Sequence, residues 1–186
     1  MLLLKIILAL FMVLIILLLI AIIRTSLIKQ KHTFYEGSKD QKRINEYAKK
    51  LQKMIKVETV SDPDKADPDK FRKLHKVMET MYPNVFKKCK KIDIDGNLLV
   101  KWKGKNSKLN PIILISHLDV VPAEGKWTYP PFSGTIADGK IYGRGTGDIK
   151  CNVMAFYQAV EELIKEGYTP ECDVYLGSSC TEEIGG

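Results

Sequence analysis

Hydrophobic positions divide the chain into a short apolar beginning and a long remainder with other patterns. Residues 6–23 form a run of eighteen uncharged, almost wholly aliphatic positions between Lys5 and Arg24. As a helix this run would be about 27 Å long, close to the thickness of a bilayer core. It has no polar face, whereas a soluble core helix would show one. We therefore predict a transmembrane signal anchor over residues 1–24.

A cleaved signal peptide is the alternative interpretation of the same apolar run. The apolar region of a signal peptide is usually shorter and ends in a small-residue cleavage site. The sequence Ala-Ile-Ile at positions 21–23 is a poor site of that kind. We favour the uncleaved anchor and expect a short polar stalk to follow it, over residues 25–37.

Beyond the stalk, apolar residues first recur at helical intervals. Ser38 and Gln41 have the spacing of a capping box, and a helical stripe over 44–55 follows them. A second helix is predicted to begin at Pro68, with the preceding aspartate as its N-cap, and to end at Pro83.

The pattern then changes to short runs that are typical of strands. These runs are residues 92–94, 98–102, 112–116 and 174–178. Between the last two, a helix is predicted from Asp148 to Glu166, with Leu163 on its inner face and Gly167 closing it. Strands that alternate with helices indicate one α/β layered domain over residues 38–186.

Charge and cysteine content exclude two classes of function. The formal net charge of +7 is spread along the chain. Its densest cluster, at residues 87–91, has no interleaved aromatic residues, so we interpret it as a solvated face rather than a nucleic-acid site. The four cysteines form no C-x-x-C pair, which argues against a structural zinc knuckle.

The first segment with catalytic residue types is Ser-His-Leu-Asp-Val-Val-Pro at residues 116–122, where a predicted strand ends. Strand ends are where α/β sheets present functional groups. His117 and Asp119 are two positions apart, so their side chains point to the same side of an extended backbone. A histidine beside a carboxylate can bind zinc through one nitrogen while the acid orients the ring or a catalytic group.

Two further segments carry carboxylates beside glycines. Residues 143–150 read Gly-Arg-Gly-Thr-Gly-Asp-Ile-Lys, which fits neither phosphate-binding fingerprint and places Asp148 where it could hold a cation. Residues 181–186 contain the pair Glu182 and Glu183 directly after a predicted strand. Adjacent glutamates usually mean an exposed acidic surface, but on one site they can divide metal binding and proton transfer between them.

Together the three segments resemble one family, the di-zinc metallopeptidases of aminoacylase and carboxypeptidase type (metallopeptidase family twenty). That family has H-x-D, then G-R-G-x-x-D-x-K, then E-E near a glycine pair, in the order found here. Residues 98–104 and 111–114 look like its carboxypeptidase S and N-acyl-amino-acid amidase branch, and 126–134 resemble its substrate-side loop. The resemblance implies part of a zinc-peptidase catalytic domain, with a mixed sheet flanked by helices.

The resemblance also implies a role for each motif residue. His117 would bind one zinc ion, Asp148 would bridge two zinc ions, and Glu183 would bind the other. Glu182 would be the general base. Asp119, behind the metal ligands, would orient or polarise the histidine ring or a catalytic group. The implied activity is hydrolysis of an amide bond in short peptides or N-acyl amino acids. A cis peptide bond directly after Asp148 is implied as well.

In the family, a further metal carboxylate, a second metal histidine and the dimerisation domain come after the glutamate pair. We therefore expect the full-length parent to be the enzyme and to form a homodimer only with that domain. We expect the 186 residues alone to be inactive. A catalytically inactive membrane-anchored fragment or interaction module is the alternative function.

Two observations point to opposite sides of the membrane. Positive charges are denser after the apolar run than before it, which favours a cytoplasmic body. The resemblance to carboxypeptidase S implies a lumenal or extracellular body. We expect a single-pass membrane protein with its body on the extracellular or lumenal side, since large domains can translocate against a modest charge bias.

Overall fold

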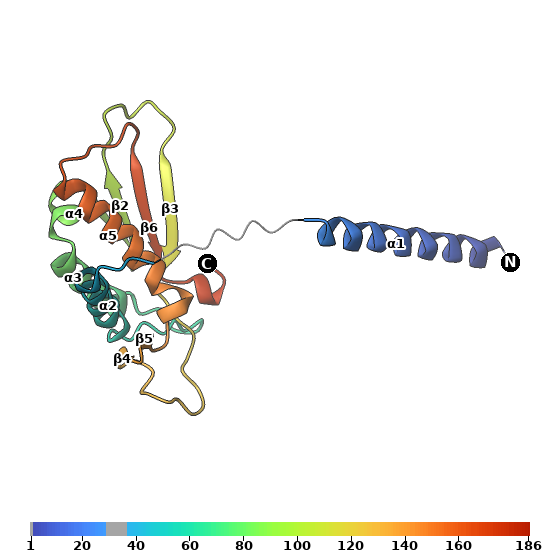
Figure 1. Cartoon of the computed structure of the whole chain (residues 1–186), viewed down its shortest axis with the longest axis horizontal. Helices are drawn as coiled ribbons and strands as arrows, with labels where there is room; N and C mark the ends of the chain where they lie inside the picture. The colour runs from blue at the N-terminus through green and yellow to red at the C-terminus, as the bar shows by residue number, and fades with distance from the viewer. Residues whose placement is uncertain (1, 29–36) are drawn as a thin grey trace. The chain divides into compact units, whose positions relative to one another are not determined.

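The computed structural model describes residues 2–28 and 37–186, which fall into two units divided after Ser38 (Figure 1). The first unit is a single helix, α1 (Leu2–Ser26), with every described side chain exposed. By length and composition α1 could cross a membrane, and a signal sequence near the N-terminus would look the same. The predicted stalk falls mostly on residues 29–36, which lie outside the described part of the chain.

The second unit is built on a four-stranded mixed sheet in the order β1-β2-β6-β3. Strands β1 (Lys90–Ile94), β2 (Asn97–Trp102) and β6 (Val174–Ser179) pair antiparallel in turn, and β3 (Ile112–His117) pairs parallel with β6. Each strand extends one or two residues beyond the run predicted from the sequence. The predicted α/β class is confirmed, and the sheet is mixed as the family resemblance implied.

Four helices cover one face of this sheet (Figure 1). They are α2 (Gln41–Ile55), α3 (Pro68–Met81), α4 (Pro83–Lys88) and α5 (Cys151–Lys165). The hydrophobic core lies between them and the sheet, where alternate residues of β2 and β6 are buried. The opposite face carries isoleucines of β1 and β3 that are more than half exposed: Ile94, Ile113 and Ile115. Within the described residues the sheet is therefore covered on one face only.

Helix α2 has a different N-cap from the predicted one, and α4 was not predicted. The N-cap of α2 is Asp40, whose carboxylate accepts a hydrogen bond from the Arg43 backbone N–H at 3.1 Å, so the predicted capping box at Ser38 is wrong. Pro83 follows the end of α3 as predicted, but it also begins α4. The first N–H groups of α4 donate to the buried Glu161 carboxylate, at 3.2 and 2.9 Å. That cap comes from a distant helix, so the local pattern does not contain it.

The helix predicted from Asp148 begins only at Cys151. Residues 146–150 form an irregular turn in which Asp148 has φ −125° and ψ 96°, far from helical values. The peptide bond between Asp148 and the next residue is cis, as the resemblance implied. Leu163, predicted to face inward, is 36% exposed, whereas Glu161 is buried because it caps α4.

The crossover from β3 to α5 contains a hairpin that the sequence analysis did not predict. Its strands are β4 (Thr135–Ala137) and β5 (Lys140–Tyr142), paired antiparallel. Asp138 and Gly139 form the turn, both with positive φ, at 50° and 70°. An Asp-Gly pair between alternating residues is a strong hairpin signal, so the sequence did carry this information.

Candidate metal centre

Two parallel strands deliver the histidine and the glutamates to the same edge of the sheet. His117 is the last residue of β3 and pairs with Ser179, the last residue of β6. A short 3-10 turn, Glu182–Ile184, follows β6 and carries both glutamates of the motif. Because the carboxyl ends of neighbouring parallel strands meet at one edge, residues far apart in sequence become neighbours here.

Asp148 reaches this edge from the irregular turn before α5, and two glycines allow the approach. A Cβ at Gly143 would lie 2.5 Å from Cγ2 of Ile55, and one at Gly145 would lie 2.7 Å from Cγ1 of Val120. Both distances are shorter than real Cβ contacts allow, and Gly145 also has φ 85°. The glycines of this motif therefore serve close packing of the turn.

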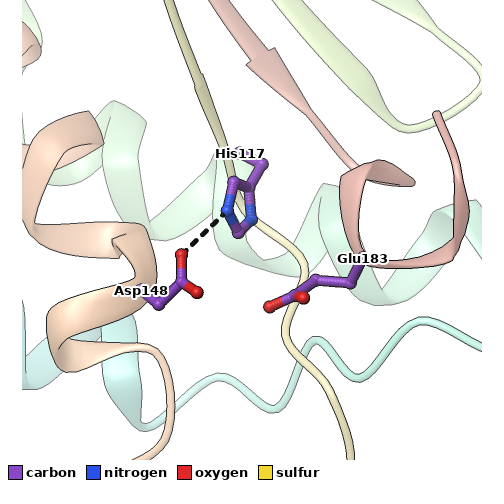
Figure 2. Close-up of side chains that lie close together, drawn as sticks. All are labelled: His117, Asp148 and Glu183. Atoms are coloured by element: carbon purple, nitrogen blue, oxygen red, sulfur yellow. Dashed lines mark hydrogen bonds and ion pairs between the residues drawn. The ribbon is translucent and has the colours of Figure 1, made fainter. Parts of the chain in front are cut away.

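The three side chains converge as ligands of a cation would (Figure 2). His117 Nε2 lies 3.2 Å from Asp148 Oδ1. One ligand atom each from His117, Asp148 and Glu183 lies within 4.8 Å of the other two. Zinc–nitrogen and zinc–oxygen bonds are about 2.0–2.2 Å long, so ligand atoms on one ion lie roughly 3–4 Å apart. An imidazole and two carboxylates converging in this way could hold a metal ion.

Asp119 contacts the histidine through both its main chain and its carboxylate. His117 Nδ1 lies 3.0 Å from the Asp119 backbone oxygen and 3.4 Å from its Oδ1. With a cation bound at Nε2, Nδ1 would carry the proton and donate to the Asp119 oxygens. Asp119 is fully buried, and its Oδ2 accepts the Glu183 backbone N–H at 2.9 Å. This one carboxylate therefore contacts both the imidazole and the main chain of the glutamate turn.

The glutamates differ in exposure. The Glu182 side chain is 59% exposed, and its Oε2 lies 3.6 Å from His117 Nε2. Glu183 is half-buried, and burial raises the pKa of its carboxyl above the ordinary value, with the negative charge of Asp148 acting in the same direction. A bound cation would reverse this effect by favouring the ionised form.

The substrate-side loop predicted at residues 126–134 leads into the β4–β5 hairpin. Trp127 in this loop is 36% exposed, and the Arg144 guanidinium lies over its ring at 5.1 Å from the centroid. Arg144 also donates to the Pro122 carbonyl at 3.2 Å. The arginine of the glycine motif therefore holds this loop against the turn that carries Asp148.

Comparisons with known proteins find one family. Residues 113–186 match the family described as peptidase family M20/M25/M40. The chain is 40% identical over 149 residues to probable carboxypeptidase S-like 2 of Dictyostelium discoideum. The alignment covers 76% of this chain and 28% of that protein. It is 42% identical over 115 residues to the N-fatty-acyl-amino acid synthase/hydrolase PM20D1.1 of Danio rerio, covering 59% and 22%.

Solved structures show the same fold. Human carnosine dipeptidase 1 aligns with a TM-score of 0.61 at 22% identity, covering 77% of this chain and 33% of that one. The metallo-carboxypeptidase Sso-CP2 of Sulfolobus solfataricus aligns with a TM-score of 0.60 at 26% identity, covering 75% and 31%. The chain thus spans between a fifth and a third of the length of these proteins.

Proposed function

The chain belongs, through residues 113–186, to peptidase family M20/M25/M40, and on this premise we propose that it is the amino-terminal part of a zinc-dependent amidohydrolase. The complete enzyme would cleave an amide bond in short peptides or N-acyl amino acids, as the names of its carboxypeptidase S-like and N-acyl-amino-acid hydrolase relatives suggest. The convergence of His117, Asp148 and Glu183 within 4.8 Å carries the proposal.

In this proposal His117, Asp148 and Glu183 would hold two zinc ions, with His117 binding one, Glu183 the other and Asp148 both. Zinc supplies two effects when bound: it lowers the pKa of a water and polarises a carbonyl. Asp119 keeps His117 in the tautomer that presents Nε2. Glu182 is exposed and its Oε2 lies 3.6 Å from that nitrogen, and in this proposal it would take a proton from the attacking water and pass it to the leaving amine.

For the 186 residues by themselves, the alternative function is a catalytically inactive anchored fragment or interaction module. With these roles, the chain would offer two protein ligands to each of two ions, since Asp148 would be counted twice. Catalytic zinc sites usually keep three protein ligands. This chain on its own is therefore expected to bind zinc weakly and to show no hydrolysis above background.

Zinc affinity of the full chain in detergent micelles tests the metal site. Competition with a chromophoric chelator measures the dissociation constant for the chain and for His117→Ala, Asp148→Ala and Glu183→Ala. Each substitution is expected to weaken binding at least tenfold, because each removes a ligand from the cluster. Glu166→Ala, at the far end of α5, is the matched control and should change nothing. A chain that binds no zinc, or binds it equally after all three substitutions, refutes the site.

A hybrid enzyme tests the reaction. Residues 39–186 would replace the matching segment of carboxypeptidase S from Saccharomyces cerevisiae, to which the chain is 32% identical over 157 residues. We expect the hybrid to hydrolyse a blocked dipeptide or an N-acyl amino acid in a chelator-sensitive manner. Glu182→Gln should lower kcat about 10²- to 10⁴-fold, as loss of a general base does, without abolishing zinc binding. Full activity of the Glu182→Gln hybrid would assign the proton transfer elsewhere.

A further inference from the structure

Lys150, the last residue of the glycine motif, is a lysine whose side chain has no exposed surface. A buried ammonium is costly unless hydrogen bonds and charges compensate it. The residue lies two positions after Asp148, on the same irregular turn. The roles described so far do not use it, and its burial needs an explanation.

The ammonium of Lys150 binds the C-terminal end of α2. Its Nζ donates to the carbonyl of Val57 at 2.9 Å and to that of Met54 at 3.2 Å. The last carbonyls of a helix have no intrahelical partners and form the negative end of its dipole. A cation is therefore well placed there. The backbone N–H of Lys150 donates to Gly145 O at 3.0 Å, which closes the turn around Asp148.

The chain directly after α2 is bonded in turn to the segment after His117. Thr59 O accepts the Val120 N–H at 3.1 Å, and its hydroxyl donates to Leu118 O at 2.6 Å. The Ser61 N–H donates to Val120 O at 3.2 Å. Residues 57–61 thus connect the lysine to the strand end that carries the histidine. Burial lowers the pKa of Lys150 to about 7, and the negative charge of Asp119 opposes that shift.

We propose that Lys150 is a positioning residue of the metal centre, which holds Asp148 at ligand distance from His117 by anchoring the Asp148 turn to the end of α2. The proposal rests on the metal site proposed above. Lys150 touches no ligand atom and acts through Asp148. Methionine has a similar length and no charge, so Lys150→Met would remove the side-chain donor from the Met54 and Val57 carbonyls and would release the turn.

Lys70 provides a matched control on the same connecting segment. Its Nζ donates to Val60 O at 2.7 Å, so it also binds a carbonyl beyond α2, but it comes from α3 and carries no link to Asp148. Lys70→Met should lower thermal stability while changing zinc affinity less than about twofold. Lys150→Met should weaken zinc binding about 10- to 100-fold, the usual effect of losing a group that orients a metal ligand.

A double-mutant cycle separates positioning from general stability. In an Asp148→Ala background, Lys150→Met should cause no further loss of zinc affinity, because the residue through which it acts is gone. The proposal is overturned if Lys150→Met and the unsubstituted chain have equal zinc affinity. It is also overturned if Lys150→Met lowers zinc affinity as much in the Asp148→Ala background as in the unsubstituted chain. A chain that binds no zinc before any substitution counts against the metal site itself. The two failures are therefore distinguishable.

Hydrogen exchange of the unsubstituted chain tests the same link if Lys150→Met does not fold. Zinc bound at Asp148 should slow exchange of the Lys150 amide and, through the ammonium, of the Val57 amide, which donates to Met54 O at 3.3 Å. Amides between β1 and β2 serve as the internal reference, since they lie outside this link. Protection of the Asp148 turn without any protection at residues 54–57 would contradict the coupling.

Discussion

At the scale of single residues, the site depends on polar groups that are buried for different reasons. Asp119 is fully buried and contacts both the His117 ring and the Glu183 backbone. Lys150 is fully buried and binds helix carbonyls. Both therefore have a partner that compensates part of the cost of burial. His75 on α3 is the contrasting case, because it is fully buried and neither ring nitrogen has a hydrogen-bond partner in the described chain.

His75 should make stability depend on pH. Burial lowers its pKa from the ordinary 6.5 to about 4, and the charged groups around it are Lys91, Asp93, Glu79 and Arg72. Below pH 6.5 the unfolded chain takes up a proton at this ring that the folded chain does not accept until about pH 4. The free energy of unfolding therefore falls as the pH falls through this window, by at most about 3 kcal/mol.

The substitution His75→Met removes this dependence. Urea unfolding of the full chain in micelles should give equal or greater stability for His75→Met at pH 7, because no hydrogen bond is lost. Its advantage over the unsubstituted chain should grow as the pH falls from 6.5 toward 4. Lys76→Met, on the exposed neighbouring position, should leave the pH dependence unchanged. A constant difference between His75→Met and the unsubstituted chain across this window would show that the ring does not titrate as argued.

Sequence reasoning identified the convergent side chains but not the contacts that hold them. The family resemblance of the three motifs predicted His117, Asp148 and Glu183 as metal ligands. The bond from the Glu183 N–H to Asp119 spans 64 positions, so no local pattern contains it. Lysine is almost never fully buried, so the residue type alone did not predict the burial of Lys150.

At the scale of secondary-structure elements, predictions succeeded where the signal is local. The Asp67 cap of α3 and the four strands of the main sheet follow from neighbouring residues. Helix α4, which was not predicted, is capped at its N-terminus by Glu161 of the distant α5. The start of α5 was placed too early because the backbone at Asp148 is extended, to present its carboxylate, rather than helical.

Helix α1 leads to a prediction about membrane association. Its apolar composition and length match a bilayer span, and we propose that it anchors the chain in a single pass with the body outside the cytoplasm. The polypeptide should then stay in the membrane fraction after carbonate extraction. Deletion of residues 2–26 should release it. Protease added to sealed, right-side-out vesicles should digest the body if it lies outside. A body recovered in the soluble fraction without α1 would instead establish a cleaved signal.

At the scale of the whole second unit, the sheet has one covered and one open face. Strand β3 is an edge strand, and its Ile113 and Ile115 are 57% and 71% exposed. Exposed apolar surface beside an unpaired strand edge favours association between chains. We expect the full chain in lipid nanodiscs to associate from disc to disc in sedimentation experiments.

The double substitution Ile113→Thr/Ile115→Thr should reduce this association, because threonine suits a strand but buries less apolar area. Ile136→Thr, on the exposed part of β4 and away from this face, is the control and should leave association unchanged. Discs that remain single with the unsubstituted chain would show that the open face is not adhesive in these 186 residues.

The parallel pairing of β3 with β6 has a kinetic consequence. The hairpin, the Asp148 turn and α5 all lie in the crossover between these two strands. Pairing β3 with β6 therefore closes a long loop, and its entropic cost comes before the stabilising contacts form. His117 and Glu183 become neighbours only after that closure. Zinc is therefore acquired after the slow step, and it should leave the refolding rate unchanged while slowing unfolding. Stopped-flow experiments with and without zinc measure both rates, and faster refolding in zinc would place the pairing of β3 and β6 earlier on the pathway.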